Sequence, residues 1–215
     1  IVTLSPEEQI LFQVRDHILQ IVQCPDYSPE LSLLESFYIL SELPTTALSG
    51  ILLADYFSTE TQTQLSAAIT NMEFSTEDML YECNELLQDL AVNYQKEGLY
   101  QSYLNPVLAD AEALAEDYGT ETLTRQWETF LQSLKGFHPL LKNVLANELF
   151  SDLLIPGGDL ENMLVQMQWM ALEYAAVRQS LFLLWLQNGG QELTYEQVRD
   201  YLVILMRMTG YDEDD

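Results

Sequence analysis

The longest apolar stretch of the sequence, LENMLVQMQWMALEYAAVRQSLFLLWLQ, runs from Leu160 to Gln187. Apolar residues occupy nearly all sides of a helical projection of this stretch, a pattern typical of a helix that other helices cover. Glu161, Glu173 and Arg178 interrupt it, so the stretch predicts a buried core helix and not a membrane span.

Helical patterns continue on both sides, and capping residues and prolines mark where they begin. Ser5, Ser28 and Thr194 each precede an apolar helical stripe as an N-cap residue, with Pro6 and Pro29 at the first helical position. The expected helices lie near residues 6–23, 29–43, 46–56, 58–71, 76–94, 106–118, 120–134, 139–153, 160–187 and 195–209. The sequence therefore predicts an all-α fold, an irregular multi-helix bundle of about eight to ten helices around the central apolar helix.

The two ends of the chain add expectations about domain organisation. Gly210 is the expected C-cap of the last helix. No long linker interrupts the pattern, so residues 1–215 are expected to form a single helical domain. The first residue is Ile1 and not a methionine, so we expect the chain to be the C-terminal part of a longer protein.

The charge balance is strongly acidic. Eight Lys and Arg residues face 34 Asp and Glu residues, which gives a formal net charge of −26. Such a chain repels nucleic acid and anionic membrane surfaces, so neither is an expected partner. The same charge would attract a lysine-bearing protein and steer it to the surface, although it also serves solubility alone.

The motifs of common enzymes are missing from the sequence. It has no glycine-rich phosphate loop, no nucleophile elbow, no paired-cysteine zinc site and no Glu three residues before a His. Cys24 and Cys83 lie far apart in no motif, and no signal-peptide pattern opens the chain. We therefore expect a cytoplasmic protein whose residues here hold no metal and no cofactor.

Charged residues in apolar surroundings are the candidate site residues. Arg178 lies on the central stretch, with Tyr174 one turn before it, and Arg15 is bracketed by apolar residues of the first helix. Glu173 precedes Arg178 by a rotation of about 500°, so the two point apart. Arg15, Glu173, Tyr174 and Arg178 are candidates for contact with a substrate or partner, and inter-helix salt bridges are the other interpretation.

The remaining polar and aromatic residues have simpler interpretations. His17, near the end of the first helix, is interpreted as a surface histidine favoured by the helix dipole and not as a general base. A set of large apolar residues recurs at core-like places and predicts packing, not a ligand cage: Trp169, Met170, Trp185, Met206 and Met208.

Four segments, taken in order, resemble a known family. They are LFQVRDHIL from Leu11, followed by Asp26-Tyr27; LKNVLANELF from Leu141, followed by Ile155-Pro156; ALEYAAVR from Ala171; and LTYEQV from Leu193. Together they resemble the C-terminal helical portion of the flagellin lysine-N-methylases (FliB-like). The middle of the chain, near residues 45–134, matches only in its helical character.

The resemblance implies a function that composition does not. Members of this family transfer methyl groups from S-adenosylmethionine to lysines of flagellin, and they carry an N-terminal cysteine-rich region that binds an iron–sulfur cluster. Cys24 and Cys83 cannot form that region. The resemblance thus implies a domain that binds substrate or shapes the site. It implies an S-adenosylmethionine-dependent enzyme only if the full protein carries the N-terminal region. The other interpretation is a relative of the family that has lost the methyl-transfer chemistry.

Two other functions stay open on the residues. One is an acidic helical chaperone of the kind that holds the twin-arginine signal peptides of redox enzymes, or another partner-binding protein. The charge and the helices fit it, but such chaperones have an Asp-His pair in a loop that connects helices. Here Asp16-His17 lies inside a predicted helix. The ligand-binding part of a helical transcription regulator is the third hypothesis, which an upstream helix-turn-helix would support.

Overall fold

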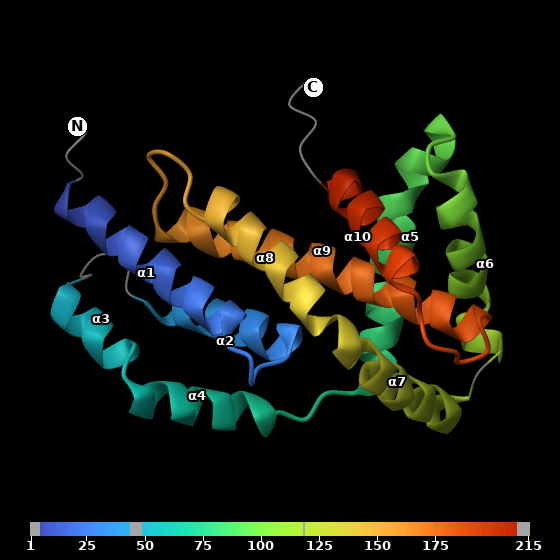
Figure 1. The fold of residues 1–215 in the computed structure, drawn as a ribbon, viewed down its shortest axis with the longest axis horizontal. Coiled ribbons are helices and arrows are strands. Elements are labelled where there is room, and N and C mark those ends of the chain that lie inside the picture. The colour runs from blue at the N-terminus through green and yellow to red at the C-terminus, as the bar shows by residue number, and fades with distance from the viewer. Residues whose placement is uncertain (1–4, 44–48, 118, 210–215) are drawn as a thin grey trace. The chain divides into compact units, whose positions relative to one another are not determined.

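The computed structural model describes residues 5–43, 49–117 and 119–209, and all of its elements are helical (Figure 1). In chain order they are α1 (Pro6–Gln23), α2 (Pro29–Glu42), α3 (Gly50–Tyr56), α4 (Thr59–Thr70), α5 (Thr76–Glu97), α6 (Gln101–Asp117), α7 (Thr120–Leu134), a 3-10 turn (Lys135–Phe137), α8 (His138–Asp152), α9 (Leu160–Gln187) and α10 (Tyr195–Thr209). The prediction of an all-α multi-helix bundle is confirmed.

The helices pack into two compact units. The first unit comprises Ile1–Glu73 and His138–Ala171, and the second comprises Phe74–Phe137 and Leu172–Asp215. Helix α9 contributes its first part to one unit and its second part to the other. The single domain expected from the sequence stays a prediction.

Local sequence explains where the helices begin. Ser5 accepts a hydrogen bond from the Glu8 amide at 3.2 Å, and the Glu8 carboxylate accepts one from the Ser5 amide at 2.7 Å. Thr194 and Gln197 form the same reciprocal pair at α10, at 3.2 and 2.8 Å. These capping boxes satisfy amide groups that have no partner inside the helix, and they confirm the predicted starts of α1 and α10.

In the first unit, α1 packs against α8 and α2, and α2 also contacts α4 and α8 (Figure 1). One face of α1 is wholly buried, through Val14, Ile18, Ile21 and Val22. These residues follow the helical repeat, so a single apolar stripe fixes which side of α1 faces the core.

In the second unit, α5 packs against α6, α7 and α10. Its core contains an aromatic cluster in which Phe182 and Trp185 of α9 meet Trp127 and Phe130 of α7. The Phe182 ring lies 5.0 Å from the Trp127 ring at an angle of 89°, the edge-to-face arrangement that aromatic quadrupoles favour.

Helix α6 differs from the prediction, because it begins at Gln101 and runs through Pro106. Proline removes one backbone hydrogen bond inside a helix. However, Leu104, Val107 and Leu108 are all buried, so the apolar stripe spans the proline and packing outweighs its local cost. The predicted start of the third helix at Thr46 and the predicted C-cap Gly210 lie outside the described residues.

The composition of α9 predicts a helix that is covered on all sides, and only part of α9 matches this prediction. Its second part is almost completely buried, for example at Val177, Leu181 and Trp185. In the first part, Val165 is 44% exposed and Trp169 is 50% exposed. The interpretation of Trp169 as a packing residue is therefore wrong, because half of its side chain is exposed to solvent. No described helix has the length and apolar character needed to cross a membrane.

Candidate functional site

The four candidate residues from the sequence belong to both units. Arg15 lies on α1 in the first unit, whereas Glu173, Tyr174 and Arg178 lie on α9 in the second.

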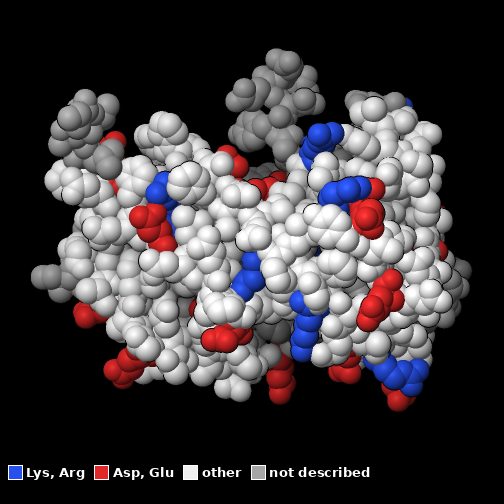
Figure 2. Space-filling view, in the orientation of Figure 1, with Lys and Arg blue, Asp and Glu red and all other residues white. Residues whose placement is uncertain are grey.

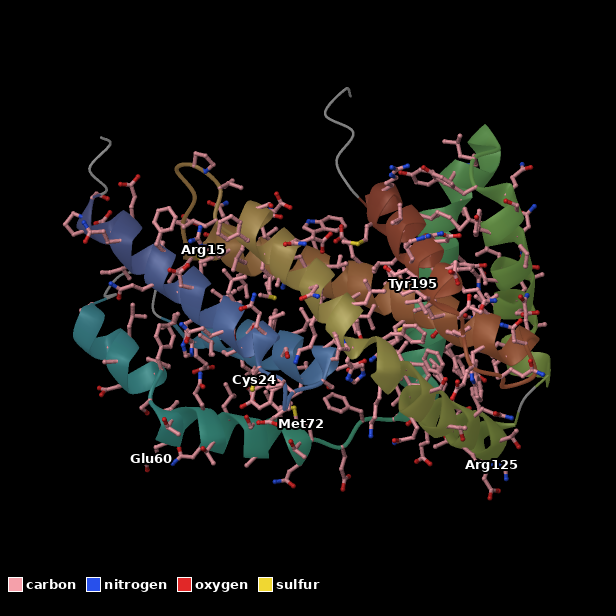
Figure 3. All side chains as sticks on the ribbon, in the orientation of Figure 1. Arg15, Cys24, Glu60, Met72, Arg125 and Tyr195 are labelled. Atoms are coloured by element: carbon pink, nitrogen blue, oxygen red, sulfur yellow. The ribbon has the colours of Figure 1, made fainter. Side chains whose placement is uncertain are left out.

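Arg15 makes contacts on its own helix and on α8. Its guanidinium forms an ion pair with Asp16 at 2.8 Å and lies 4.7 Å from the Phe12 ring centroid. On the other side it lies 5.0 Å from the Phe150 ring of α8, and its side chain is only 15% exposed (Figure 3). Cation–π contacts of this kind stabilise helix packing, so the geometry favours a structural role for Arg15.

Arg178 is held between aromatic rings in the second unit. Its guanidinium lies 4.9 Å from the Trp127 ring of α7 and 5.8 Å from the Tyr174 ring, one turn earlier on α9. It also donates to the Met79 sulfur of α5 at 3.6 Å. Tyr174 and Arg178 lie on one face of α9, as their spacing of one turn indicates, and the cluster joins three helices.

The thiol of Cys83 on α5 belongs to the same cluster. Burial raises the pKa of this thiol, while the charge of Arg178 and a hydrogen bond from it act in the opposite direction. A thiol whose pKa is raised is a poor nucleophile, because the thiolate is the reactive form. The arrangement thus favours a structural role for Cys83.

The three candidate residues on α9 differ in how much of each side chain is exposed to solvent. Tyr174 is buried, at 6% exposure, so in this structure it packs within the unit. Glu173 and Arg178 are half-buried and keep part of their side chains at the surface. Of the candidates on α9, these two are therefore the more accessible to solvent.

Sequence reasoning missed the residues that other helices bring to this cluster. Trp127, Met79 and Cys83 come from α7 and α5, far from Arg178 in the chain. Trp127 sits on the apolar face of an amphipathic helix, which indicates burial but does not indicate an arginine against its ring. Only the tertiary packing shows which charged residue meets it.

A second polar cluster lies in the first unit and was also missed. Glu35 of α2 is completely buried, and Ser66 of α4 donates to its Oε1 atom. The Tyr27 hydroxyl lies 2.8 Å from Ser66 Oγ, and among the described residues Glu35 Oε2 has no hydrogen-bond partner. Burial raises the pKa of Glu35, although hydrogen bonds from Ser66 and Tyr27 lower it in part. The sequence does carry a signal for the burial of Glu35, because this residue lies one turn before Ile39 on the apolar face of α2.

His17 is not the surface histidine that the sequence suggested. Its ring stacks on Phe57 with centroids 3.8 Å apart, and the side-chain amide of Gln62 donates to its Nε2 atom. Burial lowers the pKa of His17 to about 4. Phe57, the C-cap residue of α3, and Gln62 of α4 thus cover part of the ring.

The neutral ring of His17 predicts a specific loss of stability in acid. Because its folded pKa is depressed from 6.5 to about 4, the stability it contributes above pH 6.5 is lost as the pH falls toward 4. We expect the free energy of unfolding to fall by about 1 kcal/mol. This is well below the free energy that corresponds to the full pKa shift, because solvent screens a half-buried group.

Urea unfolding of wild type and His17→Phe at pH about 7.5 and about 4.5 measures this loss. The phenylalanine keeps a ring on Phe57 but cannot titrate. Wild type should lose more stability on acidification than the variant does. An equal loss in both proteins would contradict the assignment to His17.

Acidic side chains are spread over the surface. On the face drawn in Figure 2, Asp and Glu appear singly or in small groups among uncharged residues, with Lys and Arg between them. The −26 charge of the sequence is therefore not confined to one patch of that face. Within the described residues, no group of three His, Cys, Asp or Glu side chains is placed to hold a metal ion.

Comparison with known proteins places the chain in a family. Searches of curated proteins and of solved structures gave no match. The family described as the FliB lysine N-methylase C-terminal domain matches residues 15–215, which is nearly the whole chain. This match confirms the resemblance to the C-terminal portion of that family. The chain belongs to the FliB lysine N-methylase C-terminal domain family.

Proposed function

We propose that this chain is the helical domain that binds substrate, or shapes the methyl-transfer site, in a cytoplasmic lysine N-methyltransferase that acts on flagellin. The family match over residues 15–215 carries the proposal, because its description is that of a lysine N-methylase. S-adenosylmethionine supplies the methyl group in the proposed reaction, and no residue of this chain is assigned to bind it.

The acidic character of the chain supports a lysine-bearing substrate. A protein with a formal net charge of −26 attracts basic segments over distances of about one Debye length, roughly 8–10 Å in physiological salt. Complementary charge raises the rate of encounter more than it raises affinity. The proposed role of the surface is therefore to bring flagellin lysines to the enzyme.

Within the domain, Glu173 is the proposed contact for the substrate lysine. It is a half-buried carboxylate of α9 and the residue next to Tyr174. Tyr174 and Arg178 act as positioning residues, since the cation–π contact between them fixes the same turn of α9. Methyl transfer requires the substrate lysine to be held in line with the methyl donor. In the proposal, the Glu173 carboxylate orients the lysine ammonium before the ammonium loses its proton.

The iron–sulfur cluster of the family does not fit the residues described. Such clusters are held by about four cysteines, whereas the sequence has two. No metal-holding group of side chains is present among the described residues. We assign the cluster to the cysteine-rich region of a full-length protein and derive no step of the reaction from it.

Binding of flagellin to the chain tests the proposed partner. In surface-binding kinetics at about 50 mM NaCl we expect association, and an association rate constant that falls at least about tenfold at about 500 mM NaCl. Absence of binding at low salt, or binding that salt does not change, would count against flagellin recognition by charge. Binding of a twin-arginine signal peptide instead would favour the chaperone hypothesis.

A pair of matched variants tests the residue. Glu173→Gln should weaken flagellin binding by roughly three- to tenfold, as expected for loss of one partly buried charge contact. Glu161→Gln is the control, because it makes the same substitution at an exposed position of the same helix. Equal effects of the two variants would show that Glu173 contributes only overall charge.

A further inference from the structure

The segment of residues 49–73, called the arm below, fully buries few of its described apolar side chains. It contains α3, of 7 residues, and α4, of 12 residues, both of which are short for helices that must persist without support. Among its described side chains, only Leu53 and Ile69 are buried. In contrast, α2 alone buries Leu33, Ile39 and Leu40 and four further residues.

Two side chains of the arm, one aromatic and one polar, contact His17 of α1. Phe57 stacks on His17, and Gln62 donates to the same imidazole ring. The ring is therefore covered on one face and at one nitrogen by the arm. Water can replace a hydrogen bond of this type when the contact separates, whereas it cannot replace buried apolar contact.

Polar side chains also hold α4 to α2. The Tyr27 hydroxyl, Ser66 and the Glu35 carboxylate form a chain of hydrogen bonds in which Ser66 is the only member from the arm. Glu35 Oε2 has no described partner while the arm is in place. Removal of the arm would let water reach this oxygen, so the closed state carries a desolvation cost that the open state lacks.

The end of the arm has one more contact of the same kind. The Tyr38 hydroxyl of α2 donates to the Met72 sulfur at 3.7 Å, a weak and exposed bond. The helices themselves are rich in residues of low helix propensity, with Thr59, Thr61, Thr63 and Thr70 in α4. The arm thus combines weak internal stability with polar contacts to α2.

We propose that the arm is a detachable strap, which opens as one unit from α1 and α2 while those two helices stay folded. Opening uncovers the imidazole of His17 and the carboxylate of Glu35, two side chains that the proposed methylase function does not use. The strap is a property of the first unit alone and does not depend on flagellin recognition.

Hydrogen–deuterium exchange of the whole chain at neutral pH tests the strap. Peptides from residues 50–70 should exchange at least about tenfold faster than the buried segments of α1 and α2, as expected for opening of a local unit. Low urea should change this exchange little, because a local opening exposes little surface. Exchange of the arm at the same rate as α1 and α2 would overturn the proposal.

Two variants and a control show which contact closes the strap. Ser66→Ala removes the bond to Glu35 and should accelerate exchange in the arm by about tenfold without changing α1. Thr63→Ala is the matched control, since Thr63 is exposed and bonds only to the Thr59 carbonyl of its own helix. Tyr27→Phe, which leaves the arm unaltered in sequence, should act in the same direction as Ser66→Ala. Acceleration of α1 and α2 to the same extent as the arm would show that the arm opens only when the unit unfolds.

Discussion

Phe182→Ala is expected to lower the free energy of unfolding by about 3–5 kcal/mol, the range for removal of a fully buried aromatic side chain. Phe182 is completely buried and contacts three rings of the second unit. Their centroids lie 5.0 Å away for Trp127, 5.3 Å for Phe130 and 6.4 Å for Trp185. The substitution leaves a cavity at the centre of this cluster, and rigid neighbouring rings fill such a cavity poorly.

Urea unfolding followed by circular dichroism measures the loss. Trp169→Ala is the control, because it removes an aromatic side chain of the same helix that is 50% exposed. Its effect should stay near 1 kcal/mol or below, roughly as for other partly exposed positions. A loss below about 1 kcal/mol for Phe182→Ala would contradict the packing described for the second unit.

The second large effect is expected for Lys142→Met, a loss of about 2–4 kcal/mol. Lys142 of α8 is 8% exposed, and its ammonium donates to the Tyr27 carbonyl at 2.6 Å and to the Cys24 carbonyl. These carbonyls belong to the loop between α1 and α2. Methionine preserves the length of the side chain but removes both hydrogen bonds from the ammonium, and the Cys24 carbonyl keeps only the bond from the Tyr27 amide at 3.2 Å.

The same urea titration compares this variant with Lys135→Met, in which an exposed lysine is replaced. Lys135→Met should be nearly neutral. Burial lowers the pKa of Lys142, which indicates that its charge is costly to bury. A neutral or stabilising Lys142→Met would therefore mean that this cost exceeds the value of the two hydrogen bonds, and that the loop does not need its anchor.

Local signals explain why most helix starts were predicted correctly. Ser5, Ser28 and Thr194 each cap a helix through bonds to residues three positions away, and such bonds depend only on nearby sequence. The prediction failed at Pro106, where the local rule says that a helix begins but buried neighbours on both sides extend it. Tertiary packing decided that position.

In the candidate site, only the contacts between residues of the same helix could be predicted from the sequence. Tyr174 and Arg178 are four residues apart, so their contact follows from the helical repeat. Trp127 and Met79 reach Arg178 from other helices, and no spacing in the sequence relates them. The same holds for Glu35, whose partners Tyr27 and Ser66 come from a loop and from α4.

The family assignment and the charge together support the proposal that this domain serves methylation of flagellin lysines. The most direct measurement is the intact mass of flagellin after incubation with S-adenosylmethionine and the full-length protein that carries this chain, with the Glu173→Gln protein alongside. We predict mass increments of one methyl group each on flagellin, with fewer increments for the variant. Flagellin of unchanged mass, with a full-length protein that is folded and loaded with its cofactors, would contradict the claim.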